Sequence, residues 1–163
     1  AKARAERAYH RKVQANELRF QKEMDHLRWD LVEGILEQLA DKMHELTEDE
    51  ERYLPVLSKL LMTGVEALDQ PQLIAEVNAR DLERLTPIWE NFVSEAAPGR
   101  EVTLGPTAID TLGGILIRSN DNRLRLDNTF EGRRERLASQ LHQIIIQRLL
   151  PDRRIDDGIG GAI

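Results

Sequence analysis

The chain has 163 residues and a formal net charge of −6, with 32% charged, 40% hydrophobic and only 4% aromatic residues. This composition is typical of a helix-rich folded protein and excludes a disordered one. The absence of cysteine excludes disulfides and thiolate metal sites. No apolar run approaches the roughly 18 residues that span a bilayer, and the acidic balance argues against nucleic acid as the main partner.

Residues 1–46 predict one continuous helix of roughly 65–70 Å, because they contain no proline and are rich in helix formers. The pattern is already under way at Ala1 without a capping residue, so we expect the helix to be truncated at its N-terminus. Apolar residues recur every eleven positions, a spacing typical of straight or right-handed supercoils. A seven-residue spacing runs through the same stretch and leaves the hand open. The side chains expected to bind a partner helix are Tyr9, Val13, Phe20, Met24, Leu27 and Leu31.

Charge along this helix is divided into two blocks. Residues 1–22 contain seven lysines and arginines against two acids, and residues 23–51 contain two against eleven. Such blocks suit a partner helix with the opposite pattern, although an ordinary solvated helix surface is the alternative. From Trp29 onward the apolar stripe widens, which indicates packing against a globular body.

The next segment predicts a compact α+β head. Thr47 and Glu50 have the spacing of a capping box, and the acidic run that ends at Glu51 fits a helix start better than a metal site. We expect this helix to end near Pro71. The elements expected after it are a strand over 72–77, a helix over 79–96 capped by Asn78, and a strand over 101–105.

A β-hairpin is predicted over residues 113–128, where apolar and polar residues alternate on both sides of a polar turn at 119–122. The alternation predicts isoleucines and leucines facing the core and arginines facing outward. Asn128 and Glu131 have the spacing of a second capping box, which would open a helix that ends at Pro151.

The expected fold class is therefore α+β, with a long N-terminal coiled-coil helix followed by a small head in which helices pack a short mixed sheet. We expect three parts: a stalk helix over 1–46, a globular head over 47–151 and a flexible glycine-rich tail over 152–163.

The residues form no recognisable catalytic pattern. Gly113 and Gly114 precede a strand instead of following one, so they do not match a phosphate-binding loop. The four histidines lack metal-ligand spacing, and no serine lies in a nucleophile-elbow context. We expect no catalytic residue, no metal and no cofactor.

Six arginines fall within nineteen residues of the hairpin and the following helix, and four acids are interleaved with them. The local excess of positive charge is too small for a nucleic-acid track. Pairing with acids on a partner protein is one interpretation, and ordinary surface arginines are the other. The residues expected to dock the head are Arg118, Arg123, Arg125, Arg133, Arg134 and Arg136.

This region resembles the E subunit of the V-type and archaeal A-type rotary ATPases, in which two glycines, a hairpin and an NTLE motif open the last helix. The matching residues are Gly113, Gly114, Asn128, Thr129, Glu131 and Arg133. Phe130 stands in place of the usual leucine, and Arg134 in place of an apolar residue. The segment VNARDLERL, from Val77 to Leu85, also resembles the family, as does the order of elements along the whole chain.

The resemblance implies a non-catalytic stator protein of the peripheral stalk on the cytoplasmic side of a membrane, which it touches only through its complex. Its long helix would pair with the G subunit, called H in some archaeal complexes, and its head would hold the non-catalytic B subunit of the catalytic hexamer. The stalk would resist torque, so that ATP synthesis or hydrolysis couples to proton or sodium transport. From the residues alone, two alternative functions stay open. One is a stator or adaptor of a flagellar or secretion ATPase, and the other is a small enzyme with a dimerisation helix.

Overall fold

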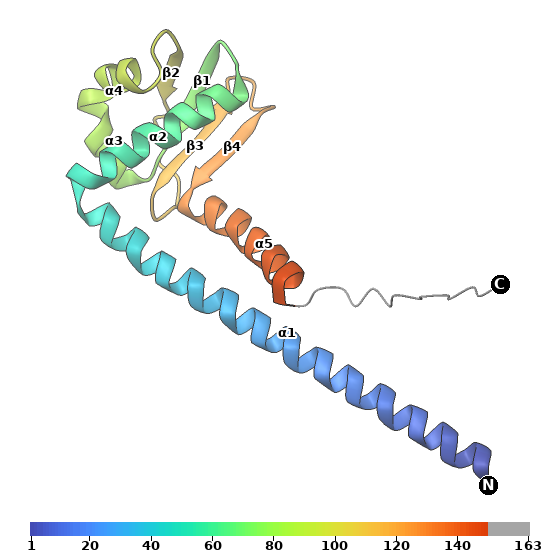
Figure 1. Cartoon of the computed structure of the whole chain (residues 1–163). Helices are drawn as coiled ribbons and strands as arrows, with labels where there is room; N and C mark the ends of the chain where they lie inside the picture. Colours follow the sequence, from blue (N-terminus) through green and yellow to red (C-terminus); the bar gives the residue numbers. More distant parts are fainter. Residues whose placement is uncertain (150–163) are drawn as a thin grey trace, which may run out of the picture. The chain divides into compact units, whose positions relative to one another are not determined.

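The computed structural model describes residues 1–149, which contain a long helix, four shorter α-helices, one 3-10 turn and a four-stranded sheet (Figure 1). The elements in chain order are α1 (Lys2–Glu48), α2 (Glu50–Leu68), β1 (Gln72–Glu76), α3 (Ala79–Leu85), the 3-10 turn η1 (Thr86–Ile88), α4 (Trp89–Ala96), β2 (Glu101–Leu104), β3 (Gly114–Ser119), β4 (Arg125–Thr129) and α5 (Phe130–Leu149). The predicted α+β class, with a long N-terminal helix and a small mixed sheet packed by helices, is confirmed. The tail expected over 152–163 lies outside the described residues.

The described chain divides into two compact units, one made of Ala1–Leu36 with α5 from Ala138 to Leu149, and one made of Glu37–Leu137. In the first unit, Val32 and Leu36 of α1 are buried, and the ring of Trp29 meets that of His142 edge-on at 4.6 Å. The second unit contains the sheet, α2, α3 and α4, and is called the head below.

The junction between α1 and α2 differs from the predicted capping box. Thr47 belongs to α1, is fully buried, and donates its hydroxyl to the carbonyl of His44 at 2.7 Å. The cap of α2 is Asp49, whose carboxylate accepts from the amide of Arg52 at 3.3 Å. The predicted Thr47 cap is therefore wrong, because α1 continues to Glu48 and the Thr47 hydroxyl bonds back to a carbonyl of its own helix. The acidic run does start a helix, as expected.

The head sheet has the strand order β2-β1-β3-β4, with β1 parallel to β2 and the other pairs antiparallel. The segment α3-η1-α4 forms the crossover between the two parallel strands. β3 occupies an interior position, which fits its run of apolar residues from Ile115 to Ile117, all of them buried.

The α2 helix lies across the sheet and packs against β3 and β4 (Figure 1). Close approach depends on Gly64, because a Cβ there would lie 2.1 Å from the side chain of Ile117. The buried core residues of the head include Tyr53, Leu57, Leu61, Leu73, Leu85, Ile115 and Ile117.

The helix expected over 79–96 is interrupted. Asn78 caps α3 as predicted, since its side chain accepts from the amide of Asp81 at 2.8 Å. The α-helix then gives way to η1, which contains Pro87. Proline lacks the amide that an α-helix requires and clashes with the preceding turn, so two short helices replace one long helix.

Candidate interaction surfaces

The stripe on α1 that was expected to bind a partner helix is largely solvent-exposed. Tyr9, Phe20 and Leu27 are 68%, 61% and 66% exposed, and Met24 is half-buried. The remaining two stripe residues, Val13 and Leu31, are also exposed. The described residues therefore leave a row of large apolar side chains uncovered on one side of a long helix, as is typical of a helix with a partner.

The glycine pair Gly113 and Gly114 lies inside the head, and Gly114 takes part in a buried hydrogen-bond network. Tyr53 of α2 donates its hydroxyl to the Oδ2 of Asp81 at 2.6 Å and accepts from the amide of Gly114 at 2.9 Å. Tyr53, Asp81 and Gly114 are all buried. One phenol group thus connects α2, α3 and the start of β3.

Glycine is required at both positions of the pair. A Cβ at Gly113 would lie 2.8 Å from the Tyr53 hydroxyl. Gly114 has φ +90°, and a Cβ there would lie 2.5 Å from the carbonyl oxygen of Asn128. The glycines therefore allow β3 to approach α2 and the end of β4, which is a packing role and agrees with the rejection of a phosphate loop.

Glu131 binds the loop before β3 and does not cap its own helix. Its carboxylate accepts from the amide of Leu112 at 2.8 Å and from the hydroxyl of Thr111. The cap of α5 is Thr129, whose hydroxyl oxygen accepts from the amide of Gly132 at 3.2 Å.

The predicted Asn128 cap is wrong, because Asn128 is a buried residue of β4. Its amide donates to the carbonyl of Leu60 at 3.1 Å and its carbonyl oxygen accepts from Arg136 at 3.1 Å. The matched motif residues Asn128, Thr129 and Glu131 therefore join β4 and α5 to the rest of the head.

Burial sets the electrostatics of this network. Burial raises the pKa of the Asp81 carboxyl, against the opposing effects of the Tyr53 hydrogen bond and of Arg84 and Arg80. Within the described residues, the Oδ1 of Asp81 has no hydrogen-bond partner and lies 3.6 Å from a guanidinium nitrogen of Arg84. Burial, followed by the hydrogen bond to Asp81, raises the pKa of the Tyr53 phenol. The phenol therefore stays protonated and keeps donating.

Sequence reasoning missed Tyr53 and Asp81. The only sequence signal for Asp81 was its place in the DLERL segment that resembles the family, and Tyr53 carried none. Both residues are recognised through contacts between segments distant along the chain, because Asp81 is 28 and Gly114 is 61 positions from Tyr53.

The six arginines expected to dock the head occupy different surroundings. Arg118 was predicted to face solvent, and this prediction is wrong. The residue is half-buried and forms an ion pair of 3.0 Å with Glu76. This pair offsets the repulsion from Arg125, which lies opposite Arg118 in the strand register. Arg123, at the hairpin tip, is 85% exposed in its side chain, and Arg125 is exposed on an edge strand.

The other three arginines, Arg133, Arg134 and Arg136, lie on the exposed side of the first turns of α5. Arg136 also donates a hydrogen bond to the buried Asn128. The hairpin and the α5 start thus present exposed cations from two elements, and their role in docking stays a prediction.

Among residues 1–149, no cluster of three or more histidine, aspartate or glutamate side chains is arranged to hold a metal ion. Over the same part of the chain, every helix is too short or too polar to cross a bilayer.

Comparison with known proteins agrees with these features. Residues 1–150 match the family model described as "ATP synthase (E/31 kDa) subunit". The chain is 47% identical over 149 residues to the E subunit of the V-type ATP synthase of Nitrosococcus oceani, covering 91% of this chain and 70% of that protein.

Archaeal relatives are more distant. The E subunits of the A-type ATP synthases of Desulfurococcus sp. strain SY and Thermococcus onnurineus are each 36% identical, over 74% and 73% of this chain. The chain spans 60% and 59% of the length of these two relatives. The match of residues 1–150 to the family model and the identity to these relatives agree with the long helix α1 and with the motif residues held inside the head. They show that this chain belongs to the family of E subunits of V-type and A-type ATP synthases.

Proposed function

We propose that this chain is a non-catalytic stator subunit of a V/A-type ATPase, pairing through α1 with a single-helix partner of the G or H type. The observation that carries the proposal is the uncovered apolar stripe on α1, in which side chains more than 60% exposed recur along the helix. Burying one such side chain contributes about 1.5–3 kcal/mol. A partner helix that covers the stripe would therefore be held firmly.

The head would attach this stalk to the non-catalytic B subunit of the hexamer. The exposed arginines of the hairpin and of the first turns of α5 support this part of the proposal, because clustered guanidinium groups suit carboxylates on a partner. A stalk held in this way would oppose rotation of the hexamer, and ATP synthesis or hydrolysis would then couple to proton or sodium transport. The protein itself would lie on the cytoplasmic side of the membrane and would bind no nucleotide.

The parts of the chain would divide this work. Residues 1–46 would act as the stalk and residues 47–151 as the attachment head.

Light scattering tests the proposal directly. The chain is measured alone and after mixing with the single-helix protein encoded beside its gene. We expect a monomer or weak self-associate alone and a tight 1:1 heterodimer in the mixture, with increased helicity by circular dichroism. A stable homodimer that ignores the added protein would contradict the stator function.

A further inference from the structure

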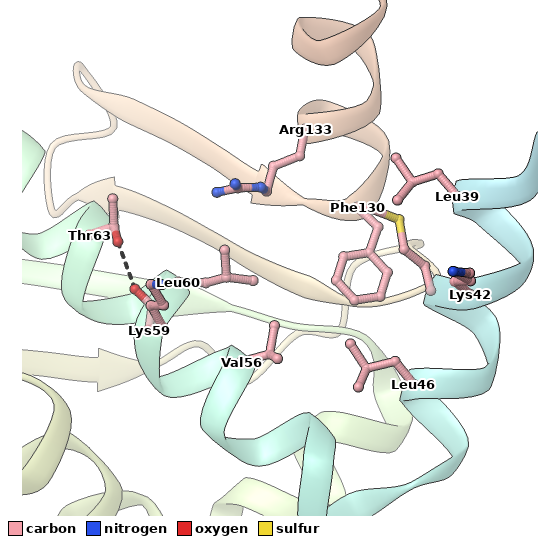
Figure 2. Close-up of a pocket in the computed structure, with 10 residues that line it drawn as sticks. Leu39, Lys42, Leu46, Val56, Lys59, Leu60, Thr63, Phe130 and Arg133 are labelled. Carbon is pink, nitrogen blue, oxygen red and sulfur yellow. Dashed lines mark hydrogen bonds between the residues drawn. The ribbon is translucent and has the colours of Figure 1, made fainter. Parts of the chain in front are cut away.

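A groove of about 490 Å³ lies within the head, between the last turns of α1, the middle of α2 and the first turn of α5. Its apolar lining consists of Leu39, Met43, Leu46, Val56, Leu60 and Phe130. Figure 2 shows Leu46, Val56 and Phe130 pointing into the same space from three different helices. Leu60 and Phe130 are buried, whereas Val56 and the three α1 side chains are only partly covered. The core of the head therefore opens to solvent at this point.

The lining residues follow one helical face on each side of the junction at Asp49. The α1 residues are at positions 39, 42, 43 and 46, and the α2 residues are at positions 56, 59, 60 and 63. Both sets have the spacing i, i+3, i+4, i+7, which marks one face of an α-helix. Two helices thus turn matching faces toward a common space, and a third amphipathic helix is the element that such a groove accommodates.

The charge around the groove has one sign. Lys42, Lys59 and Arg133 line it and are exposed, and no carboxylate from the described part of the chain belongs to the lining. Within residues 1–149 these three cations form no ion pair. This is unusual in a chain with a net charge of −6, in which acids outnumber lysines and arginines by 29 to 23.

We propose that this groove binds an amphipathic helix of a partner protein, with apolar residues at i, i+3, i+4 and i+7 and carboxylates along both flanks. The apolar face would cover Met43, Leu46 and Val56, and the flanking carboxylates would meet Lys42, Lys59 and Arg133. The apolar contacts would supply affinity, and the cations would select acidic helices over basic ones. This surface is separate from the α1 stripe and from the hairpin arginines, and it shares Arg133 with the arginines expected to dock the head.

A designed peptide pair tests the proposal. The acidic peptide is an 18-residue helix with leucine at the four spaced positions and glutamate on both flanks; the control peptide has lysine at every glutamate. We expect the full chain to bind the fluorescein-labelled acidic peptide in the micromolar range by fluorescence anisotropy, and to bind the lysine peptide at least tenfold more weakly. Higher salt should weaken the acidic complex.

The decisive variant is Lys42→Glu combined with Lys59→Glu, because both side chains are exposed and their reversal leaves the core intact. We expect an affinity loss of at least tenfold with an unchanged melting temperature. The matched control, Lys12→Glu with Lys22→Glu, reverses two exposed lysines on the stalk part of α1 and should change little. The methyl resonance of Met43 should shift when the acidic peptide binds.

Three outcomes would overturn the proposal. One is the absence of binding at millimolar peptide. Another is an affinity loss in the stalk variant with none in the groove variant, which would locate the peptide on the α1 stripe. The last is a change in sedimentation of the free chain caused by the groove variant without an effect on the peptide, which would make the occupant a second copy of the chain. Failure here would leave the light-scattering test of the stator function unaffected.

Discussion

Tyr53 joins three segments of the head through one hydroxyl group, which donates to Asp81 and accepts from the amide of Gly114. Neither partner has access to bulk water, since both residues are buried. A buried polar group that loses its partner keeps its desolvation cost and gains nothing in return. The Tyr53 hydroxyl group is therefore expected to contribute more to the stability of the head than its small size indicates.

Replacement of Tyr53 by Phe is expected to lower the free energy of unfolding by about 1–3 kcal/mol, because the Gly114 amide and the Asp81 carboxylate both lose a partner. Urea titration followed by Trp89 fluorescence in a Trp29→Phe background measures this change, as Trp89 packs in the head and donates to Val102. The same substitution at the exposed Tyr9 is the control. Equal midpoints for the two variants would show that the network contributes no stability.

Asp81→Asn is expected to reveal a pH-dependent contribution. Burial raises the pKa of Asp81 above the ordinary value of 3.8, so the folded state binds the proton more tightly than the unfolded state. This carboxyl therefore adds stability as the pH falls through its folded pKa and loses that contribution as the pH rises. Relative to the asparagine variant, the wild type should become more stable on acidification.

Urea midpoints of both proteins, measured from neutral pH down to the ordinary carboxyl range, give the difference in free energy of unfolding at each pH. The exposed Asp110→Asn serves as the reference for a surface carboxyl. If the free energy of unfolding of the wild type, measured relative to that of the Asp81 variant, falls or stays constant as the pH falls, the effect of burial is contradicted.

Most of the exposed large apolar side chains in the described part of the chain lie on α1. Phe20 and Leu27 lie on one side of this helix, and Leu18, which is also exposed, lies nearly opposite to both at about 100° per residue. Position around the helix therefore separates residues that can meet one partner helix from residues that cannot.

Combined replacement of Phe20 and Leu27 by Ala should weaken binding of the partner helix at least tenfold, because each buried side chain contributes about 1.5–3 kcal/mol. The urea midpoint of the head should not change, since both residues lie outside it. Isothermal titration calorimetry measures the affinity, and Leu18→Ala is the matched control. A head that loses stability in parallel with the affinity would contradict a division of labour between stalk and head.

At the scale of the whole molecule, the chain combines a long helix with an exposed apolar stripe, which we propose pairs with a partner helix, and a head that is connected by its own hydrogen-bond network. Except for Arg118, the arginines expected to dock the head are exposed at the hairpin tip, on β4 and at the start of α5, whereas the glycines and Glu131 of the motif make contacts within the head. Docking would then depend on side chains around the motif, while the motif maintains the shape of the head.

Arg125→Glu and Arg123→Glu should each weaken attachment of the stalk heterodimer to the catalytic hexamer, because charge reversal converts attraction to partner acids into repulsion. We expect a loss of at least threefold at low salt, which becomes smaller as salt is raised. Arg52→Glu, an exposed head residue on α2, should have little effect. Biolayer interferometry with immobilised hexamer measures these affinities. Equal effects of the three variants would exclude a specific role for the hairpin.

The sequence by itself determined the features that depend on neighbours along the chain. Helix formers without proline predicted α1, alternation around a polar turn predicted the β3–β4 hairpin, and the Asn78 cap was identified from its place before a helix. These signals are local, because 3.6-residue and two-residue periods and turn chemistry act over a few positions. The spaced motif residues also indicated the family, which the comparisons then confirmed.

Only the tertiary structure decided which polar residues are internal. Thr47 and Asn128 looked like helix caps and are buried, and Arg118 looked exposed and pairs with Glu76. The partners of Asn128 and Arg118 come from segments 68 and 42 positions away. A local pattern cannot encode such distant partners, because burial depends on how the helices and strands pack together. The groove between α1 and α2 has the same origin, since its two faces meet only where the chain turns at Asp49.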